Sequence, residues 1–353
     1  MVMIMAALLM PASVSNAAGV MDWLQEHAAH LPASDQAARP AADAASLLTL
    51  ENRETEMYPL PSPDGRYLLC VSWRGNDAWI SRRFSENGDP ANRVTDDKRA
   101  FDSIHWQDDD KVYFLSDRAG GLGLWQKIAD GEGMQRRLLR LSGKLTHPIL
   151  LADGAVIATR FKPVRATGKH PAHHQQDAFN NWKFPGFTTE VVRYDRDGGE
   201  AKVLSEGVNP ALSPDGKWVV FAMPTGRSTH LFRMRTDGAD LIQITDARST
   251  DVQPSWSKDG KSILFTSNRA HNDLRHPKRS NWDIWMIDIE GRNLQQITFD
   301  KARDGGARMG RDGRIYFHSD RAIDAATRKQ HQITSGSAHG FHIWVIDPPQ
   351  QAQ

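Results

Sequence analysis

The sequence is poor in cysteine, in long apolar runs and in excess charge. Its single cysteine, Cys70, excludes an internal disulfide, and the apolar run at residues 67–72 favours a buried thiol. After residue 18, no run approaches the roughly 18 apolar residues of a membrane-spanning helix. The net charge is +1, from 44 Lys and Arg against 43 Asp and Glu. Charge therefore indicates neither nucleic acid nor a membrane surface as the partner.

Catalytic motifs are also missing. The nucleophile elbow Gly-x-Ser-x-Gly does not occur, and its nearest relative, Gly336-Ser-Ala-His-Gly340, lacks the required spacing. The sequence has no Gly-rich phosphate loop and no His-Glu-x-x-His helix. Asp195-Arg-Asp-Gly198 is too short for a calcium loop and lies where a hairpin turn is expected. We therefore predict no catalytic residue and no cofactor.

The first 45 residues have the composition of an export signal followed by a tether. Residues 3–10 form a short apolar run, and Ser15-Asn-Ala17 supplies a small-x-small cleavage pattern, although no Lys or Arg precedes the run. This pattern predicts a signal peptide at 1–17 and a periplasmic protein. Residues 18–45 are predicted to hold a short helix and an Ala/Pro-rich tether.

An internal repeat organises the rest of the chain. Ser-Pro-Asp-Gly occurs at 62–65 and 213–216, with a variant at 257–260 and weaker relatives at 107–110, 151–154 and 310–313. The last residues of these turns, at 65, 110, 154, 216, 260 and 313, are 45, 44, 62, 44 and 53 residues apart. Proline presets φ and glycine accepts a positive φ, so each motif predicts a hairpin turn.

Each repeat predicts one blade of a β-propeller. A short alternating or β-branched run follows each turn, for instance at 218–222 and 262–267. A second strand comes next, as at 283–288, and Gln-Ile-Thr ends the repeat at 243–245 and 296–298. A four-stranded sheet of this kind buries both faces only when several sheets stack radially. The sixth repeat lacks its outer strand, and residues 46–50 resemble the missing one. We therefore predict an all-β fold, a six-bladed β-propeller of four-stranded antiparallel blades, whose last blade is closed by an N-terminal strand.

These repeats resemble the TolB-like propeller family. The resemblance rests on Pro210-Ala-Leu-Ser-Pro-Asp-Gly216, Phe265-Thr-Ser-Asn-Arg269, Asp283-Ile-Trp-Met-Ile-Asp288 and Gln295-Gln-Ile-Thr298. It implies a propeller over residues 46–347 and a tail at 348–353. The same repeat occurs in propellers of prolyl oligopeptidase family hydrolases, so it is specific for fold and not for function.

Two departures from these families limit what the resemblance implies. TolB carries an α/β domain before its propeller, and here about 27 residues stand in that place. The hydrolases carry a catalytic domain after the propeller, whereas this sequence stops at Gln353. We therefore expect a solitary exported propeller, and the role of TolB's additional domain is not carried over.

The irregular spacings predict three long loops on one face. The connection between the second and third strands covers residues 162–189 in blade 3, 268–282 in blade 5 and 320–341 in blade 6. Lys and Arg against Asp give these loops charges of +3, +3 and +1, and the loops hold seven of the 14 histidines. Long loops in compact domains are usually functional or disordered, so solvated loops without a ligand are the alternative.

Basic and aromatic side chains in these loops suit an anionic partner. The predicted binding residues are His170, His173, His174, Trp182, Lys183, Arg269, Arg275, His276, Trp282, Arg321 and His339. Three of them, together with a carboxylate, are also weak candidates for a metal site: His170, His173, His174 and Asp177. No helix or strand pattern fixes the geometry of these four residues, so solvated histidines are favoured over a metal.

The leading hypothesis is therefore a periplasmic binding or scaffold module. Its partner would be an envelope protein, an anionic glycan or a peptidoglycan fragment, held on the face with the long loops. A metal-assisted lyase or hydrolase acting on an acidic polysaccharide is the alternative. A nonfunctional or regulatory relative of a hydrolase propeller is the third hypothesis.

Overall fold

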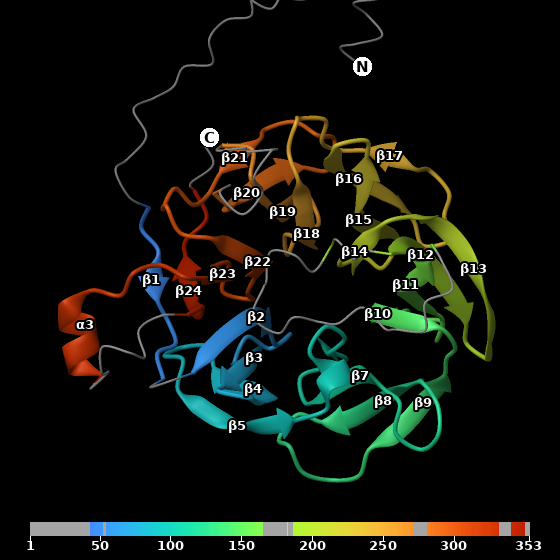
Figure 1. Cartoon of the computed structure of the whole chain (residues 1–353), viewed down its shortest axis with the longest axis horizontal. Coiled ribbons are helices and arrows are strands. Elements are labelled where there is room, and N and C mark those ends of the chain that lie inside the picture. The colour runs from blue at the N-terminus through green and yellow to red at the C-terminus, as the bar shows by residue number, and fades with distance from the viewer. Residues whose placement is uncertain are drawn as a thin grey trace, which may run out of the picture. The chain divides into compact units, whose positions relative to one another are not determined.

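The computed structural model describes residues 43–51, 54–164, 182, 186–270, 281–331 and 340–349. The predicted signal peptide and nearly all of the predicted tether lie outside these residues, and both stay predictions. The remaining chain forms six four-stranded antiparallel sheets arranged as a ring (Figure 1). The predicted fold class is therefore confirmed, including the number of blades.

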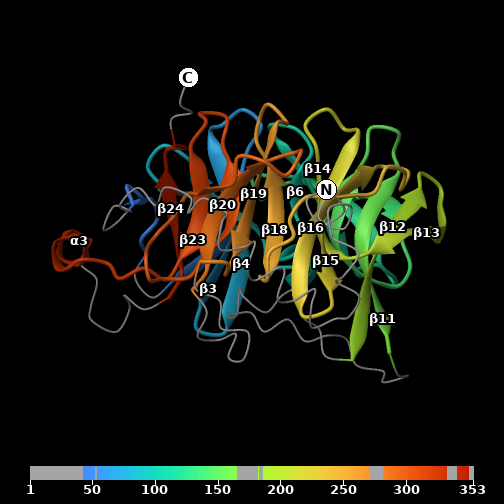
Figure 2. The same ribbon diagram turned by 90° about the horizontal axis from the view of Figure 1, so that it is seen from above.

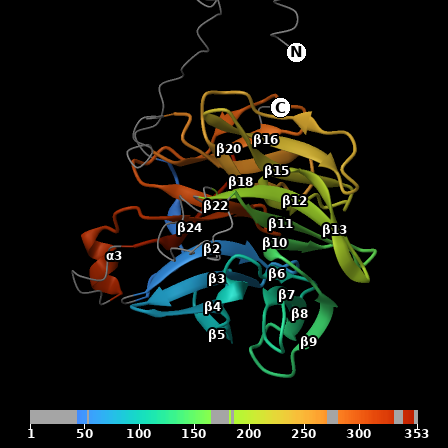
Figure 3. The same ribbon diagram turned by 45° about the vertical axis from the view of Figure 1, so that its right-hand side comes forward.

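Five blades are built from four consecutive strands, the first of which lies nearest the centre of the ring (Figures 1 and 3). Blades 1 and 2 contain β2 (Thr55–Pro61), β3 (Tyr67–Arg74), β4 (Asp77–Phe84) and β5 (Pro90–Thr95), then β6 (His105–Trp106), β7 (Lys111–Ser116), β8 (Gly123–Ile128) and β9 (Arg136–Arg140). Blade 3 contains β10 (Lys144–Leu150), β11 (Val156–Pro163), β12 (Phe187–Asp195) and β13 (Gly198–Glu206).

Blades 4 and 5 contain β14 (Val208–Leu212), β15 (Trp218–Thr225), β16 (Ser228–Arg235) and β17 (Ile242–Gln243), then β18 (Asp251–Trp256), β19 (Ser262–Ser267), β20 (Asp283–Asp288) and β21 (Gln295–Gln296). Blade 6 consists of β22 (Asp304–Met309), β23 (Ile315–Ser319), β24 (His342–Ile346) and β1 (Ser46–Leu47). Two short helices, η1 (Lys98–Ala100) and α3 (Ala325–Gln330), lie in connections.

The recurrent Ser-x-Asp-Gly turn is held by its own side chains. Ser62 Oγ donates to Asp64 Oδ1 at 2.6 Å and accepts the backbone N–H of Tyr67 at 2.9 Å. The turn that begins at Ser213 has the same two bonds, at 2.6 Å to the aspartate and 2.9 Å from the backbone N–H. In the turn that begins at Ser257 these distances are 2.7 and 2.9 Å. The glycine that follows has φ near +77°, +71° and +70° in the three turns, which explains why this position needs glycine.

A bulge with a left-handed residue recurs in five of the six inner strands. The register of β2, β10, β14, β18 and β22 shifts at this point, and one residue takes a positive φ. These residues are Tyr58, His147, Asn209, Gln253 and Gly306, with φ between 48° and 62°. Proline follows the first four, and it cannot donate to a strand ladder. The bulges bend the strand ends that surround the centre of the ring.

A buried polar unit recurs in blades 2, 5 and 6. In blade 5 the Asp251 carboxylate accepts hydrogen bonds from Ser267 Oγ at 2.6 Å and from the Arg269 guanidinium at 2.7 Å. The Arg269 guanidinium also lies 5.0 Å from the ring centroid of Phe265 and 5.2 Å from that of Trp285. One arginine therefore connects the start of the inner strand with the second and third strands.

The same residue types form the unit in the other two blades, although in blade 2 the acid lies before η1 and the arginine is 33% exposed. The acid, serine, arginine, phenylalanine and tryptophan are Asp97, Ser116, Arg118, Phe114 and Trp125 in blade 2, and Asp304, Ser319, Arg321, Phe317 and Trp344 in blade 6. Arg321 also donates to Asp43 at 2.9 Å, which fixes the segment before β1 to blade 6. The sequence signature is Ser-x-Arg directly after the second strand.

The ring closes as the sequence predicted. β1 pairs antiparallel with β24, with Ser46 opposite Val345 and Leu47 opposite Trp344. Just after β1, Thr49 Oγ1 accepts the N–H of Ile343 at 3.1 Å. The N-terminal strand thus supplies the outer strand that the last repeat lacks, and blade 6 gains a complete sheet.

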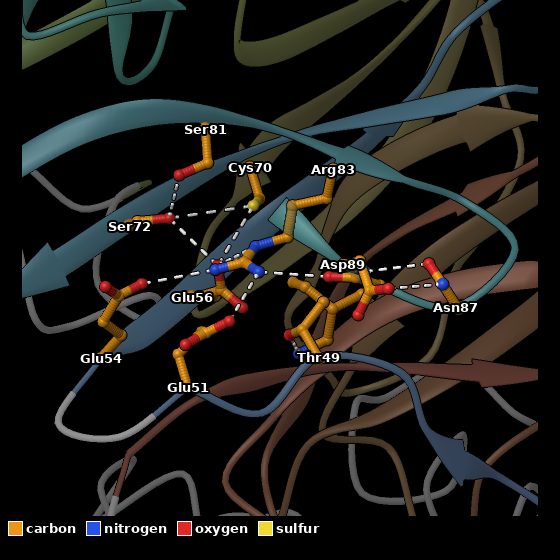
Figure 4. A network of polar contacts seen from close by, with 12 residues as sticks. Thr49, Glu51, Glu54, Glu56, Cys70, Ser72, Ser81, Arg83, Asn87 and Asp89 are labelled. Atoms are coloured by element: carbon orange, nitrogen blue, oxygen red, sulfur yellow. Dashed lines mark hydrogen bonds and ion pairs between the residues drawn. The ribbon is translucent and has the colours of Figure 1, made fainter. Parts of the chain in front are cut away.

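Arg83 connects the closing segment to blade 1 (Figure 4). Its side chain, only 3% exposed on β4, donates to Glu56 at 2.5 Å and to Glu54 at 3.3 Å, and it also pairs with Glu51 at 3.4 Å. Burial and the neighbouring charge of Glu56 raise the pKa of Glu54. Arg83 is therefore the cation on which the buried Glu56 depends, and Glu54 pairs with Arg83 as well as with Arg74.

The substitution Arg83→Met tests this dependence. It leaves Glu54 and Glu56 buried without their shared cation, so we expect the free energy of unfolding to fall by about 3–5 kcal/mol. The matched control is Arg82→Met on the same strand, because Arg82 is partly exposed and bonds Asn92 at 2.7 Å. Urea denaturation should show a control effect below about 1 kcal/mol. Equal losses for the two variants would contradict the role given to Arg83.

His318 makes the stability of the ring depend on pH. It is fully buried on β23, and its Nδ1 accepts the N–H of Tyr58 at 3.2 Å, which joins blade 6 to blade 1. Burial, with the positive charges of Arg303 and Arg308, lowers the pKa of His318 to about 3. Between this value and the ordinary pKa near 6.5, the unfolded chain binds one more proton than the folded protein. The contribution of neutral His318 to the free energy of unfolding is therefore fully present above pH 6.5, and it decreases as the pH falls from there toward 3.

The substitution His318→Gln should remove this contribution. Glutamine can still accept the Tyr58 N–H, but it does not titrate, so the loss of stability between pH 6 and pH 5 should shrink by about 1 kcal/mol. Urea denaturation at both pH values, with wild type in parallel, measures the difference. Identical pH slopes would show that His318 is not the titrating group.

Candidate functional site

A pocket of about 670 Å³ lies at the centre of the ring and is lined by all six blades. Its walls are the last residues of the inner strands and the turns that follow them. These residues are Leu60–Pro63 of blade 1, His105–Gln107 and Tyr113 of blade 2, Ile149 and Leu150 of blade 3, Pro210–Leu212 and Pro214 of blade 4, Ser255–Lys258 of blade 5, and Arg308–Arg311 of blade 6.

The pocket belongs to the face that carries the Ser-x-Asp-Gly turns, which we call the turn face. Viewed from the side, the strands of the blades run between two faces (Figure 2). The turns after the inner strands lie on one face, whereas the connections between second and third strands lie on the other, the loop face. The long connections in blades 3, 5 and 6 begin after Pro163, Ser267 and Ser319, so they belong to the loop face. The pocket therefore lies on the face opposite to the predicted binding face.

The described wall of the pocket contains cationic side chains and no carboxylate. Lys258 and Arg311 are exposed in the turns, and Arg308 lies on the inner strand β22. Arg308 is surrounded by protein atoms and remains partly exposed, because it borders the pocket. Burial lowers the pKa of its guanidinium to about 10, and no nearby acid offsets this effect. Arg308 is therefore a positive charge at pH 7 held in a desolvated position.

The contacts of Arg308 differ from those of the arginines that hold the blades together. Its Nη1 donates to the backbone oxygen of Ala307 at 2.9 Å, and no ion pair joins it to any carboxylate of the described residues. Arg269, by comparison, is paired with Asp251 at 2.7 Å. A guanidinium has five N–H donors in a planar fork that matches a carboxylate or phosphate. Arg308 is thus arranged to receive an anion from outside the described chain.

His105, which lies near Arg308, is neutral at pH 7. Burial and the positive charge of Arg308 lower its pKa to about 3. The His105 ring stacks on Tyr113 with centroids 5.5 Å apart, and Asn209 Nδ2 lies 3.2 Å from His147 Nε2. In this part of the pocket the permanent positive charge is therefore carried by Arg308.

Two tryptophans form rigid aromatic parts of the wall. Trp106 Nε1 donates to the Leu60 oxygen at 2.9 Å, and Trp256 Nε1 donates to the Ala211 oxygen at 2.9 Å. Each bond joins neighbouring blades, so both indoles are fixed before any ligand enters. Preorganised walls lower the entropy cost of binding.

Four of the predicted binding residues lie within the described residues: Trp182, Trp282 and Arg321 are buried, and the Arg269 side chain is 10% exposed. Trp182 and Trp282 pack with ring centroids 5.0 Å apart, so the long connections of blades 3 and 5 meet on the loop face. Arg269 and Arg321 belong to the repeated polar units described above. We expected exposed side chains, and burial results because each one has an internal partner. Whether they contribute to binding stays a prediction.

The other predicted residues lie outside the described residues. They are His170, His173, His174, Lys183, Arg275, His276 and His339, and the metal candidate Asp177 is also outside. Within the part that the structure describes, no group of three or more His, Cys, Asp or Glu side chains could hold a metal ion. The hypothesis of a metal-assisted lyase or hydrolase is tested separately, by metal analysis of the purified protein and an assay for unsaturated sugar products.

Sequence analysis missed Arg308, although the repeat itself contains the signal. Two residues before each turn, the six repeats carry Leu60, His105, Ile149, Ala211, Ser255 and Arg308. All six line the pocket, and only the last is charged at neutral pH. Aligning the repeats by column, rather than searching for known motifs, would have selected this arginine.

Comparisons with known proteins agree with the fold. No family model matches the sequence. An uncharacterized protein of Agrobacterium fabrum is 25% identical over 255 residues, which are 69% of this chain and 76% of that protein. The Tol-Pal system protein TolB of Francisella tularensis is 24% identical over 137 residues, and the match covers 37% of this chain and 30% of TolB. Dipeptidyl-peptidase 5 of Porphyromonas gingivalis is 42% identical over 73 residues, only 11% of its length.

Solved structures show the same architecture at low sequence identity. A putative TolB from Agrobacterium tumefaciens has a TM-score of 0.50 at 19% identity and covers 69% of this chain and 80% of its own. An oligogalacturonate lyase from Vibrio parahaemolyticus has a TM-score of 0.51 at 12% identity, and the match covers 88% of this chain and 97% of the lyase. These likenesses concern the fold.

The described residues hold no helix that is long and apolar enough to cross a membrane. Their six blades and the closing strand agree with the likeness to TolB of Francisella tularensis and to the putative TolB of Agrobacterium tumefaciens. The chain is a six-bladed β-propeller that is similar to TolB.

Proposed function

We propose that this propeller is an exported binding or scaffold module that holds an anionic group of an envelope partner in its central pocket. The partner is an envelope protein or an anionic glycan such as a peptidoglycan fragment. One observation carries the proposal: Arg308 is a desolvated cation in a pocket whose described lining contains no carboxylate. The TolB-like fold supports an envelope setting, since the matched TolB is a Tol-Pal system protein.

The energetics favour an anion as the bound group. A hydrogen bond to a charged group contributes about 1.5–3 kcal/mol when both partners are desolvated. Arg308 has already lost much of its hydration on folding, so an anion that enters the pocket meets a cation that needs little further desolvation. Exposed cations such as Lys258 and Arg311 contribute less, because water and salt screen them.

The two faces of the propeller can be separated by mutation. Arg308→Gln removes the charge from the turn face and keeps hydrogen-bonding capacity. Deletion of residues 165–181 removes most of the long connection of blade 3 from the loop face and keeps the buried Trp182. Arg66→Gln serves as the matched control, because Arg66 is an exposed turn-face arginine outside the pocket lining.

Tagged proteins should be used to capture partners from an envelope extract and from digested peptidoglycan, with mass spectrometry identifying what is retained. We expect wild type, Arg66→Gln and the deletion variant to retain the same partner, and Arg308→Gln to lose it. Loss only in the deletion variant would place binding on the loop face instead. Capture of no specific partner by wild type would contradict the binding function itself.

A further inference from the structure

We infer that the central pocket selects a carboxylate carried on a peptide segment with apolar neighbours, rather than an acidic sugar. The inference rests on the proposed function, because it names the chemistry of the group that Arg308 holds. It follows from three properties of the wall: how its polar groups are used, what its apolar part consists of, and where its charges lie.

The serine hydroxyl groups in the wall are already used within the protein, and the Tyr113 oxygen also has a partner. Ser255 Oγ donates to the Ala307 oxygen at 2.7 Å, and the Tyr113 hydroxyl accepts the N–H of Leu150 at 3.2 Å. Ser62 and Ser257 each bond the aspartate and a backbone N–H of their own turn. A sugar ring carries several hydroxyl groups that lose their hydration when bound, and this wall offers few free partners to replace it.

The two indole N–H groups and the oxygen of the Gln107 amide are used in the same way. Both tryptophan N–H groups are bonded to backbone oxygens of the preceding blade. The Gln107 amide oxygen accepts a hydrogen bond from Gln126 at 2.6 Å. Of the three cations in the wall, the Arg308 guanidinium is the one withdrawn from water, and it can bind one carboxylate in a two-pronged geometry.

The remaining wall is largely apolar. Leucine, isoleucine and methionine side chains line it together with prolines from blades 1 and 4, among them Leu150, Leu212, Met309, Pro61 and Pro214. Apolar area of this kind stabilises aliphatic or proline side chains by about 25 cal/mol per Å² buried. A volume of about 670 Å³ admits the tip of a polypeptide segment and not a folded domain.

The charges are arranged at two depths. Arg308 lies on the inner strand, whereas Lys258 and Arg311 are exposed in turns of neighbouring blades, with Lys258 Nζ donating to the Arg311 backbone oxygen at 3.3 Å. An acidic side chain at the tip of a segment would meet Arg308. Further acids beside it would meet the exposed cations, which act mainly on the rate of association.

The test uses two pools of synthetic heptapeptides with blocked ends. In the first pool a central glutamate is flanked by varied leucine, isoleucine, proline and tryptophan residues. The second pool has glutamine in place of the glutamate, and tri-galacturonate is the acidic sugar probe. Equilibrium dialysis against the full chain, followed by mass spectrometry, measures how much of each probe is retained.

We expect glutamate peptides to be retained by wild type, with at least about 10-fold weaker binding of their glutamine counterparts and of the same peptides to Arg308→Gln. Arg308→Lys should restore part of the affinity, because it keeps the charge without the planar fork. Thermal unfolding of both variants shows whether the fold is intact, and a loss of binding counts only where it is.

Three outcomes would overturn the inference. Retention of the glutamine pool equal to that of the glutamate pool would show that the pocket does not select a carboxylate. Retention of tri-galacturonate in preference to the peptides, with loss in Arg308→Gln, would make the ligand an acidic glycan and leave the proposed function standing. Retention of no probe would reject the peptide ligand, while the capture experiment would still decide the proposed function.

Discussion

Buried pairing between guanidinium groups and carboxylates is the interaction on which this propeller depends. In blades 2, 5 and 6 an arginine after the second strand binds an acid at the start of the blade and covers the aromatic rings of the next two strands. Arg83 does the same for the closing segment with three glutamates. Such pairs contribute little net stability when complete, yet a missing partner is costly, so they specify how strands meet.

Arg308 differs from these paired arginines, and this difference marks the central pocket as a candidate binding site. It is surrounded by protein like the structural arginines, but the described residues supply it with a backbone oxygen and no carboxylate. It also lies where all six inner strands converge, beside tryptophans fixed by bonds between blades. Arg83, Arg269 and Arg321 are paired with acids, whereas Arg308 has no carboxylate among the described residues and borders the pocket, so it is the arginine that can receive an anion there.

The repeat made the fold predictable, because Ser-x-Asp-Gly turns and the strand at 46–50 follow from local chemistry and from counting. The roles of single arginines were harder to predict. Arg269 and Arg321 stand next to long loops, and their acids lie 18 and 17 residues earlier in the chain, so local composition suggested solvated cations. Arg308 lies in a short strand that no motif marks. Its place in the pocket wall becomes apparent only when the fold brings the ends of the six inner strands together.

The central claim is that Arg308 is an open anion site. Crystals of the protein soaked in bromoacetate would test it directly, because the bromine gives an anomalous signal that marks each bound carboxylate. The account predicts a peak in the central pocket with the carboxylate within hydrogen-bonding distance of the Arg308 guanidinium. Peaks confined to exposed lysines and arginines, with the central pocket holding only water at saturating bromoacetate, would contradict it.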